Sequence, residues 1–351
     1  MKRIQRAAAL LTAVLLLTVA PVRAAKAPSF TDVPESHWAY ESIRLASERG
    51  LINGVSDTAF GLGAQITRAQ YAMMLCRLME WNMLTPEHGS YSDNQDKNAW
   101  YYSAIETARA NGALLKLDDA CGPNEPLPRE EMAAMTVRAL GYSSLAGLVQ
   151  DDCPFTDVTT NPGYIALAYR MGFMNGVDET RFSPRSVSTR EQAAAVLLRV
   201  YDRTRGALSE RTVVYSGGEK TPAHAVVAES LTGTGTPIPM SPRAPMESVY
   251  AAAVKAGENG AVVLNAKPYV QFVSNGAVGR GLELTASELD AYLADRTAHT
   301  YRSTRYASSY LTRSGSGGTT SVVWYETDED IAGKVELCRL LGVGAVYLLK
   351  A

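Results

Sequence analysis

Polar and apolar positions in the first 200 residues predict short helices arranged in pairs. After Thr67, apolar residues recur three and four positions apart, the spacing of one helix face, at Tyr71, Met74, Leu75 and Leu78. A shorter amphipathic helix is expected around residues 38–46, and Asn53-Gly54 is expected to end it. A glycine-bearing loop over residues 55–66 separates the two helices. The pattern therefore predicts a helix, a loop and a second helix.

This unit occurs three times, with arginines spaced by 61 residues. Each arginine opens the second helix of its copy, in Thr67-Arg68-Ala69-Gln70, Pro128-Arg129-Glu130-Glu131 and Thr189-Arg190-Glu191-Gln192. Each copy begins with an aromatic residue and, two positions on, an aspartate: Phe30 and Asp32, Tyr91 and Asp93, Phe155 and Asp157. A fixed period of this kind is the sequence signature of stacked repeats.

The start of the second helix is a candidate anion site. Thr67 and Thr189, each with a glutamine three positions on, match a capping box, which places Arg68 and Arg190 in the first helical turn. Free backbone amides and the positive end of the helix dipole favour an anion there. A guanidinium beside them adds a planar, two-pronged donor for a carboxylate or phosphate.

Aromatic and acidic side chains of the repeat complete the candidate site. Faces for a sugar ring can come from Trp38, Trp100 and Tyr164. Acceptors for sugar hydroxyls can come from Asp32, Asp93 and Asp157. The same residue types also allow a purely structural interpretation, in which arginine pairs with an aspartate of the neighbouring repeat, aspartate caps a helix and tryptophan lies in the core.

These motifs resemble the S-layer homology module of bacterial surface proteins. In the first copy the resemblance rests on Phe30-Thr31-Asp32-Val33, Trp38, Gly50, Asn53-Gly54, Phe60 and Ile66-Thr67-Arg68-Ala69-Gln70. It implies a mainly α N-terminal part of three modules, at residues 28–85, 90–147 and 153–204, assembled with three-fold pseudo-symmetry and with grooves between neighbours.

The ligand implied by this resemblance is a pyruvylated secondary cell-wall polysaccharide linked to peptidoglycan. The contact to the ketal-pyruvate carboxylate then belongs to Arg68, Arg129 and Arg190, with Thr67, Thr189, Gly54 and Gly176 at the same grooves. Binding of this kind is non-covalent and multivalent, so weak grooves can still retain a protein on a polymer.

The second copy departs from the repeat pattern. Leu115 stands where the other copies have Gly54 and Gly176, and leucine resists a left-handed turn. Cys121 replaces a phenylalanine, Pro128 replaces the capping threonine, and Glu130 and Glu131 bring negative charge beside the arginine. Grooves that use Arg68 and Arg190 are therefore expected to bind better than one that relies on Arg129.

The N-terminus has the pattern of an export signal, predicted at residues 1–27. A basic start precedes an apolar run, Ala7 to Val19, that is well short of the ~20 residues a membrane span needs. Cleavage after Ala24 removes four basic residues and moves the formal charge from −2 to −6. No stable membrane span after cleavage and no nucleic-acid partner are expected, and the protein is predicted to be secreted to the cell wall or cell surface, in association with an S-layer.

Cysteine and histidine spacing predicts neither a metal site nor a cofactor. The cysteines are Cys76, Cys121, Cys153 and Cys338, and the four histidines are scattered. Free thiols are expected, with a bridge between Cys121 and Cys153 as the alternative in an oxidising exterior.

The C-terminal third has a different character, predicted as a linker at 205–245 and a small α/β domain at 246–351. Two β-rich segments, 261–273 and 321–325, precede a helix at about 328–341 and a last apolar run at 345–349. Strand, helix and strand at the end indicate a right-handed βαβ unit. Residues 322–334 and 342–347 resemble the closing part of glycoside hydrolase family 18 barrels.

The sequence gives no support for catalysis in this domain. That family's Asp-x-x-Asp-x-Asp-x-Glu motif is missing from the sequence, and the C-terminal part is shorter than the ~250 residues of a typical barrel. Glu326, Asp328, Glu329 and Asp330 are more simply the start of a helix. The expected function is non-covalent anchoring of a secreted protein to the wall. The alternatives are a wall-targeted glycoside hydrolase acting on peptidoglycan or a chitin-like glycan, and a lattice-forming protein.

Overall fold

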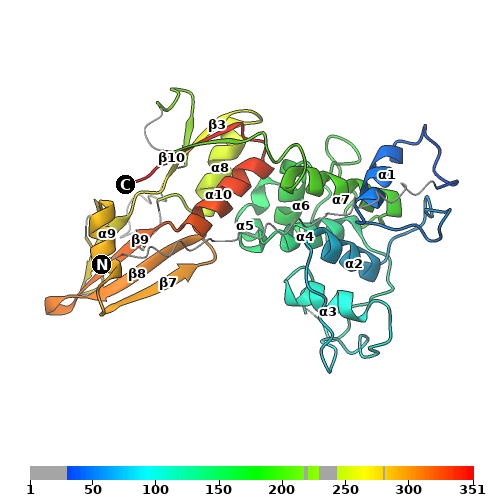
Figure 1. The fold of residues 1–351 in the computed structure, drawn as a ribbon, viewed down its shortest axis with the longest axis horizontal. Helices are drawn as coiled ribbons and strands as arrows, with labels where there is room; N and C mark the ends of the chain where they lie inside the picture. The colour runs from blue at the N-terminus through cyan, green and yellow to red at the C-terminus, as the bar shows by residue number, and fades with distance from the viewer. Residues whose placement is uncertain (1–29, 117, 217–219, 229–242, 280) are drawn as a thin grey trace, which may run out of the picture.

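The computed structural model describes residues 30–351 except 117, 217–219, 229–242 and 280. The predicted export signal lies outside the described residues, as does part of the predicted linker. Figure 1 shows a helical part formed by the first half of the chain beside a second part that contains the sheets. The molecule is therefore mixed α and β, with an all-helical first part and a second part in which helices alternate with strands.

Three helix pairs build the helical part, as the apolar periodicity predicts. The first helices of the pairs are α1 (Tyr40–Glu48), α3 (Tyr102–Ala110) and α6 (Pro162–Arg170). The second helices are α2 (Arg68–Leu78), α4 (Arg129–Ala139) and α7 (Arg190–Thr204), and they begin directly after Thr67, Pro128 and Thr189. A short helix α5 (Ser143–Leu148) and a 3-10 turn (Gln150–Asp152) follow α4.

The apolar face predicted for α2 is confirmed, because Tyr71, Met74, Leu75 and Leu78 are all buried. The predicted end of α1 is wrong. The helix ends at Glu48, and Gly50 takes the left-handed conformation, with φ of 69°. Gly54 lies further along, in the loop.

Gly54 and Gly176 are required by space and not by backbone sign, since neither has a positive φ. A Cβ on Gly54 would lie 2.5 Å from the carbonyl oxygens of Ser56 and Ala59 and from the Phe30 ring, and one on Gly176 would meet Phe155 equally closely. The reason given above for the odd Leu115 is thus wrong. The Leu115 side chain is exposed.

A closed triangle of backbone hydrogen bonds joins the three repeats just before their second helices. Ile66 donates to the carbonyl of Ser188 (3.0 Å), Ser188 donates to Leu127 (2.8 Å) and Leu127 donates to Ile66 (2.9 Å). Isolated β-bridges join Gln65 with Thr189, Thr67 with Pro126 and Pro128 with Val187. Each helix start is therefore fixed by the backbone of another repeat.

Two sheets make up the second part of the molecule. The parallel sheet has the order β1 (Val213–Ser216), β10 (Ala345–Leu349), β3 (Ala261–Asn265) and β2 (Val226–Ala228). The antiparallel sheet has the order β5 (Ala277–Val278), β4 (Tyr269–Ser274), β9 (Thr319–Tyr325), β8 (Ser308–Ser314) and β7 (Ala298–Ser303), and β6 (Leu282–Glu283) also pairs with β4. The helices here are α8 (Met246–Ala256), α9 (Ala286–Leu293) and α10 (Asp328–Leu340), with a 3-10 turn at Ser316–Gly318.

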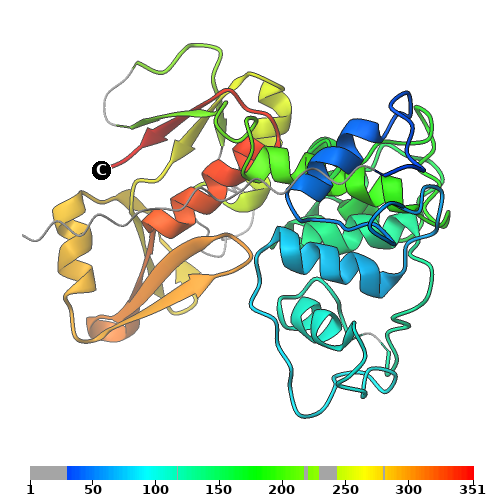
Figure 2. The ribbon, with the colours of Figure 1, turned by 45° about the vertical axis from the view of Figure 1, so that its right-hand side comes forward.

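The predicted final βαβ unit is wrong, because β9 and β10 belong to different sheets. The helix α10 connects them, and Figure 2 shows it between the two sheets. The parallel neighbours β2 and β3 are joined through α8 instead. The sequence did not reveal this connection, because β1 and β2 are short and lie inside the polar range 205–245 that is predicted as a linker.

The two parts share one hydrophobic core. Leu145 and Val149, in and after α5, belong to the same buried cluster as Val249 and Tyr250 of α8. Arg203 of α7 donates to the carbonyl of Leu340 at the end of α10 (3.2 Å). The sheet part is therefore packed against the helical part and is not a separate body on a tether.

The acidic residues at the start of α10 are held in structural contacts. Asp330 is fully buried, caps the helix through Thr327 and pairs with Arg302. Glu326 is buried against Lys334 at 2.5 Å, and burial raises the pKa of Glu326. Asp328 and Glu329 are exposed and form ion pairs with Lys350 (3.6 Å) and Arg302 (3.1 Å). The expected helix start is confirmed.

We predict that Gly54→Ala destabilises the protein by about 1–3 kcal/mol, because the added methyl meets backbone oxygens that cannot move alone. Gly147→Ala in α5 is the control, since a Cβ there has open space and a helical alanine is favoured over glycine. Urea unfolding of both variants measures the difference. An unchanged Gly54→Ala midpoint would contradict this account of the loop.

Candidate functional site

Each repeated arginine reaches into the loop of another repeat. Arg190 of the third copy donates to the carbonyls of Asn53 (2.6 Å) and Phe60 (3.0 Å) in the first. Arg129 of the second donates in the same way to Asn175 (2.8 Å) and Phe182 (3.0 Å) in the third. Arg68 of the first reaches the carbonyls of Cys121 (2.5 Å) and Gly122 (2.7 Å) in the second. The three contacts form a ring in which every arginine holds the next loop.

Two of the three guanidinium groups have no acidic partner. Arg129 and Arg190 make no ion pair within the described residues, and their Nη1 atoms donate no hydrogen bond there. Each guanidinium lies over a phenylalanine ring, Phe182 at 4.6 Å and Phe60 at 5.0 Å. Burial lowers the pKa of both arginines more than the nearby carboxylates raise it, Asp157 for Arg129 and Glu191 and Asp32 for Arg190, so neither positive charge is fully compensated. These groups are fixed in orientation and still have donors for an anion.

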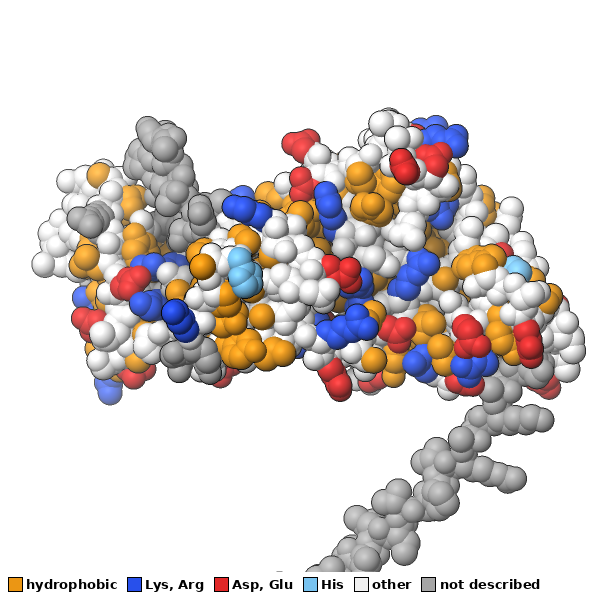
Figure 3. All heavy atoms as spheres, turned by 90° about the horizontal axis from the view of Figure 1, so that it is seen from above, with side chains coloured by type: hydrophobic (Ala, Val, Ile, Leu, Met, Phe, Trp, Pro, Cys, Tyr) orange, Lys and Arg blue, Asp and Glu red, His pale blue; other side chains and the backbone are white. Residues whose placement is uncertain are grey.

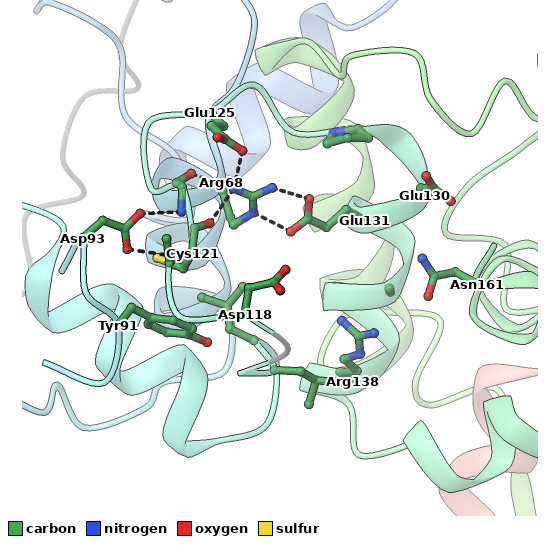
Figure 4. Close-up of a pocket in the computed structure, with 16 residues that line it drawn as sticks. Arg68, Tyr91, Asp93, Asp118, Cys121, Glu125, Glu130, Glu131, Arg138 and Asn161 are labelled. Carbon is green, nitrogen blue, oxygen red and sulfur yellow. Dashed lines mark hydrogen bonds and ion pairs between the residues drawn. The ribbon is translucent and has the colours of Figure 1, made fainter.

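Arg68 is different, because a carboxylate already occupies its guanidinium. Glu131 accepts from Nε (2.5 Å) and from Nη2 (2.8 Å), and Glu125 lies 3.3 Å from Nη1. The hydrogen bond to Glu131 raises the pKa of Arg68. Figure 4 shows this bidentate contact between Arg68 and Glu131. An external carboxylate would have to displace an internal one.

The difference arises at the third position of the second helix. Gln70 and Gln192 occupy it in the first and third copies, where their side chains accept from the backbone N–H of Thr67 (3.1 Å) and Thr189 (3.2 Å). Pro128 of the second copy has no N–H to offer. Glu131 is thereby left free of a capping role and extends to Arg68.

Two cavities lie beside these arginines. The Arg68 cavity, of about 520 Å³, is lined by Arg68, Glu131, Asp118, Arg138, Asn161 and residues around them. The Arg129 cavity, of about 260 Å³, is lined by Arg129, Gly176, Gln192, Arg199, Trp38 and their neighbours. Their linings correspond repeat by repeat, since Arg68, Glu131 and Arg138 are 61 residues before Arg129, Gln192 and Arg199. Both are grooves between copies.

A family comparison agrees with the repeated motifs. The model of the S-layer homology domain matches residues 29–72 and 154–194. The chain therefore carries two regions of S-layer homology. The matched ranges contain Arg68 and Arg190 with their helix starts, and the second copy lies outside them.

Relatives of this chain include surface proteins and polysaccharide-degrading enzymes. Exoglucanase XynX of Acetivibrio thermocellus is 28% identical over 54% of this chain and 18% of the relative. An S-layer protein of Bacillus thuringiensis subsp. finitimus is 26% identical over 52% of this chain and 22% of the relative. A cellulosome-anchoring protein of Acetivibrio thermocellus is 32% identical over 38% of this chain and 30% of the relative. The chain thus spans less than a third of each relative's length.

Solved structures resemble the chain only weakly. The spore cortex-lytic enzyme SleL of Bacillus cereus has a TM-score of 0.29 and 13% identity, over 65% of this chain and 60% of that chain. A likeness at this level carries no argument about fold or activity. The similarity to glycoside hydrolase family 18 therefore stays a prediction.

Other chemistry in the described part of the chain is sparse. No described helix has the length and apolar character to cross a membrane. No group of three or more His, Cys, Asp or Glu side chains there is arranged to hold a metal ion. All four cysteines are free thiols in the structure, so the alternative bridge between Cys121 and Cys153 is not formed. On the face in Figure 3, acidic and basic side chains are interspersed.

The aspartates of the three repeats hold the loops that receive the arginines. Asp32 accepts from the backbone amides of Phe60, Gly61 and Leu62 at 2.7–3.1 Å. Asp93 and Asp157 do the same with two amides each of the second and third loops. Burial opposes their ionisation, but the amide donors outweigh it and lower the pKa of all three carboxyls. All three carboxylates already accept hydrogen bonds from backbone amides, and their predicted contact to sugar hydroxyls stays a prediction.

Only Trp38 of the three predicted aromatic residues lines one of these two cavities, and a contact to a sugar ring stays a prediction. The side chains of Trp38 and Trp100 are 62% and 56% exposed, unlike core tryptophans. Trp38 lines the Arg129 cavity, which lies between the second and third copies. Tyr164 is half-buried under the guanidinium of Arg138, at 4.6 Å. The sequence placed these residues at their own helix starts but could not show which groove each one reaches.

The expected ranking of the three arginines does not follow from these contacts. Glu131 is two positions from Arg129 and so faces another side of α4, where it neutralises Arg68. Arg190 is only 5% exposed, whereas Arg129 is half-buried and lines a cavity. Arg129, expected to be the weakest anion ligand, therefore has the best combination of free charge and access.

Sequence reasoning missed a second set of arginines. Arg138 lines the Arg68 cavity and Arg199 the Arg129 cavity, and Arg77 is the equivalent residue of the first copy. Their spacing of 61 residues is the same as that of the first set and was the signal that could have revealed them.

Acid should weaken the loops through the aspartates. We predict that Asp32→Asn destabilises the protein by about 1–2 kcal/mol at pH 7. This value is somewhat below the contribution of fully buried hydrogen bonds to a charged group, because Asp32 is only partly buried. Because the folded-state pKa of Asp32 lies below its ordinary value of 3.8, this contribution is present above about pH 4 and is lost as the pH falls further. Urea unfolding between pH 3 and pH 7 measures it.

Asp57→Asn is the matched control on the same exposed loop and should leave stability unchanged at every pH. A difference between wild type and Asp32→Asn that stays constant down to pH 3 would show that the charge of Asp32 is not what holds the loop.

Proposed function

We propose that this chain attaches a secreted protein non-covalently to the bacterial cell surface, by binding pyruvylated secondary cell-wall polysaccharide linked to peptidoglycan. The relatives named as an S-layer protein and a cellulosome-anchoring protein support attachment to the wall. We further propose three S-layer homology modules, at 28–85, 90–147 and 153–204, related by three-fold pseudo-symmetry. The cyclic contacts of the arginines and of Ile66, Leu127 and Ser188 support this arrangement.

The observation that carries the proposal is the Arg129 cavity. A ketal-pyruvylated sugar has a carboxylate on an otherwise uncharged ring. In this cavity Arg129 provides an unpaired guanidinium held by two carbonyls, and the exposed ring of Trp38 provides an apolar face. Arg199 adds a second positive charge at the same cavity.

We propose no catalytic role for the C-terminal part. Glycosidic hydrolysis uses two carboxyl groups that flank the bond, whereas Glu326 and Asp330 are buried in contacts with Lys334 and Arg302. The relative named as an exoglucanase shares only 18% of its length with the match. A wall-targeted glycoside hydrolase remains the second candidate, and release of reducing ends from peptidoglycan by the purified protein is the result that would favour it.

Co-sedimentation with purified cell walls tests the anchoring function and the role of Arg129 together. Wild type should sediment with walls that carry the pyruvylated polymer and should stay in solution after mild acid removes the ketals. Arg129→Gln should lower the affinity about tenfold or more, because it removes the uncompensated charge. Arg185→Gln, an exposed arginine of the third repeat, is the control and should bind as wild type does. Equal binding by Arg129→Gln and wild type would refute the assignment.

Glu131→Gln provides a test in the opposite direction. The substitution keeps the shape of the side chain but removes the charge that neutralises Arg68, so the affinity for the pyruvylated polymer should rise several-fold. The titration is repeated with the depyruvylated polymer, for which no gain is expected. A loss of affinity on Glu131→Gln would mean that the carboxylate itself contacts the sugar.

A further inference from the structure

The Arg68 cavity contains a second arginine, Arg138, that has no anionic partner. Resting on the proposed function, we propose that Arg138, and not Arg68, receives the pyruvate carboxylate in this cavity. The side chain comes from the last turn of α4 and lines the cavity. Figure 4 shows it extending toward the space below Glu131. The family's repeated motif at the helix start does not include this residue.

The polar atoms of Arg138 are poised but unused. Its Nε is buried without a hydrogen-bond partner, and the side chain makes no ion pair within the described residues. A buried donor of this kind is costly unless a partner completes it. The stack on Tyr164 at 4.6 Å holds the guanidinium plane in place. An arriving carboxylate would satisfy donors that the folded chain leaves open.

Arg68 has little left to offer an anion in the same cavity. Its Nε and Nη2 atoms donate to Glu131, and its Nη1 atom donates to two backbone carbonyls and to Glu125. Displacing the Glu131 carboxylate for another carboxylate exchanges like for like and gains nothing. Within this cavity a carboxylate therefore binds Arg138, whose guanidinium is free, in preference to Arg68, whose guanidinium is paired.

Other groups of the cavity fit a sugar attached to that carboxylate. Tyr91 is 1% exposed, and its hydroxyl has no hydrogen-bond partner in the part of the chain that the structure describes, although the residue lines the cavity. Burial raises the pKa of Tyr91 to about 12, so the hydroxyl stays a donor at neutral pH. Asn161 adds an amide at the same cavity. The Tyr91 hydroxyl and the Asn161 amide are uncharged hydrogen-bonding groups, which suit the uncharged ring of a sugar.

The acidic residues of the cavity set its strength below that of the Arg129 cavity. Glu125 and Glu131 are paired with Arg68, and Asp93 holds backbone amides. Asp118 is exposed and has no ion pair with any described residue, and Glu130 accepts from the hydroxyl of Thr160. The negative charges of these residues reduce the attraction of the Arg68 cavity for a carboxylate. The Arg129 cavity has a second arginine, Arg199, and the neutral Gln192 in its lining.

A saccharide small enough to fill one groove tests the inference on the full chain. The probe is a ketal-pyruvylated hexosamine methyl glycoside, and the same sugar without pyruvate is its control. Calorimetry gives the number of sites, and nitrogen-15 NMR of arginine Nε–H groups shows which arginines respond. The Arg138 signal, identified by its loss in Arg138→Gln, should shift on titration while the Arg68 signal stays in place. Arg138→Gln should remove one site, or weaken it at least tenfold.

Control variants separate this result from misfolding and from failure of the proposed function. Arg109→Gln removes a half-buried arginine of the same repeat whose Nε also lacks a partner, but which does not line the cavity. It should retain every site, and Arg138→Lys should recover part of the lost one. No binding of the probe by wild type would refute the proposed function. Binding by wild type with a shifted Arg68 signal and a static Arg138 signal, or with all sites intact in Arg138→Gln, would refute only this inference.

Discussion

The closed triangle of hydrogen bonds among Ile66, Leu127 and Ser188 is the constraint on which the helical part depends. Each bond satisfies a backbone group just ahead of a helix with a partner from another repeat. No single repeat can make this structure, because its donor and acceptor belong to two different neighbours. The triangle brings the three helix starts together, and each arginine is thereby placed within reach of another repeat's loop.

One position then makes the three equivalent places chemically unequal. Gln70 and Gln192 are consumed in capping their own helices, while Glu131 follows a proline that gives it nothing to cap. The freed carboxylate crosses to Arg68 and neutralises it. A substitution at the start of α4 in the second repeat thus decides the electrostatics of a groove whose arginine comes from the first. Symmetry of the backbone does not carry over to symmetry of charge.

Much of the local structure could be predicted, and much of its assembly could not. Apolar spacing and the threonine caps located the helix starts at Thr67 and Thr189, because helix signals are local. Arg68 contacts another repeat, Asp32 contacts a distant loop, and Trp38 lines a cavity with residues of other repeats. No local sequence pattern reports these neighbours. The same limit explains the misplaced β9 and β10, which follow each other in the sequence but lie in different sheets. The role of Gly54 could not be predicted from the sequence, because the position requires free space beside the Phe30 ring, which only the fold reveals.

The central claim is that an uncompensated guanidinium selects the groove that binds a carboxylate-bearing sugar. A crystal structure of the full chain with a ketal-pyruvylated hexosamine tests it most directly. The account predicts the pyruvate carboxylate on Arg129, within hydrogen-bond distance of Nη1, and the sugar ring against Trp38. A saccharide whose carboxylate instead replaces Glu131 on Arg68, with the Arg129 cavity unoccupied, would contradict it.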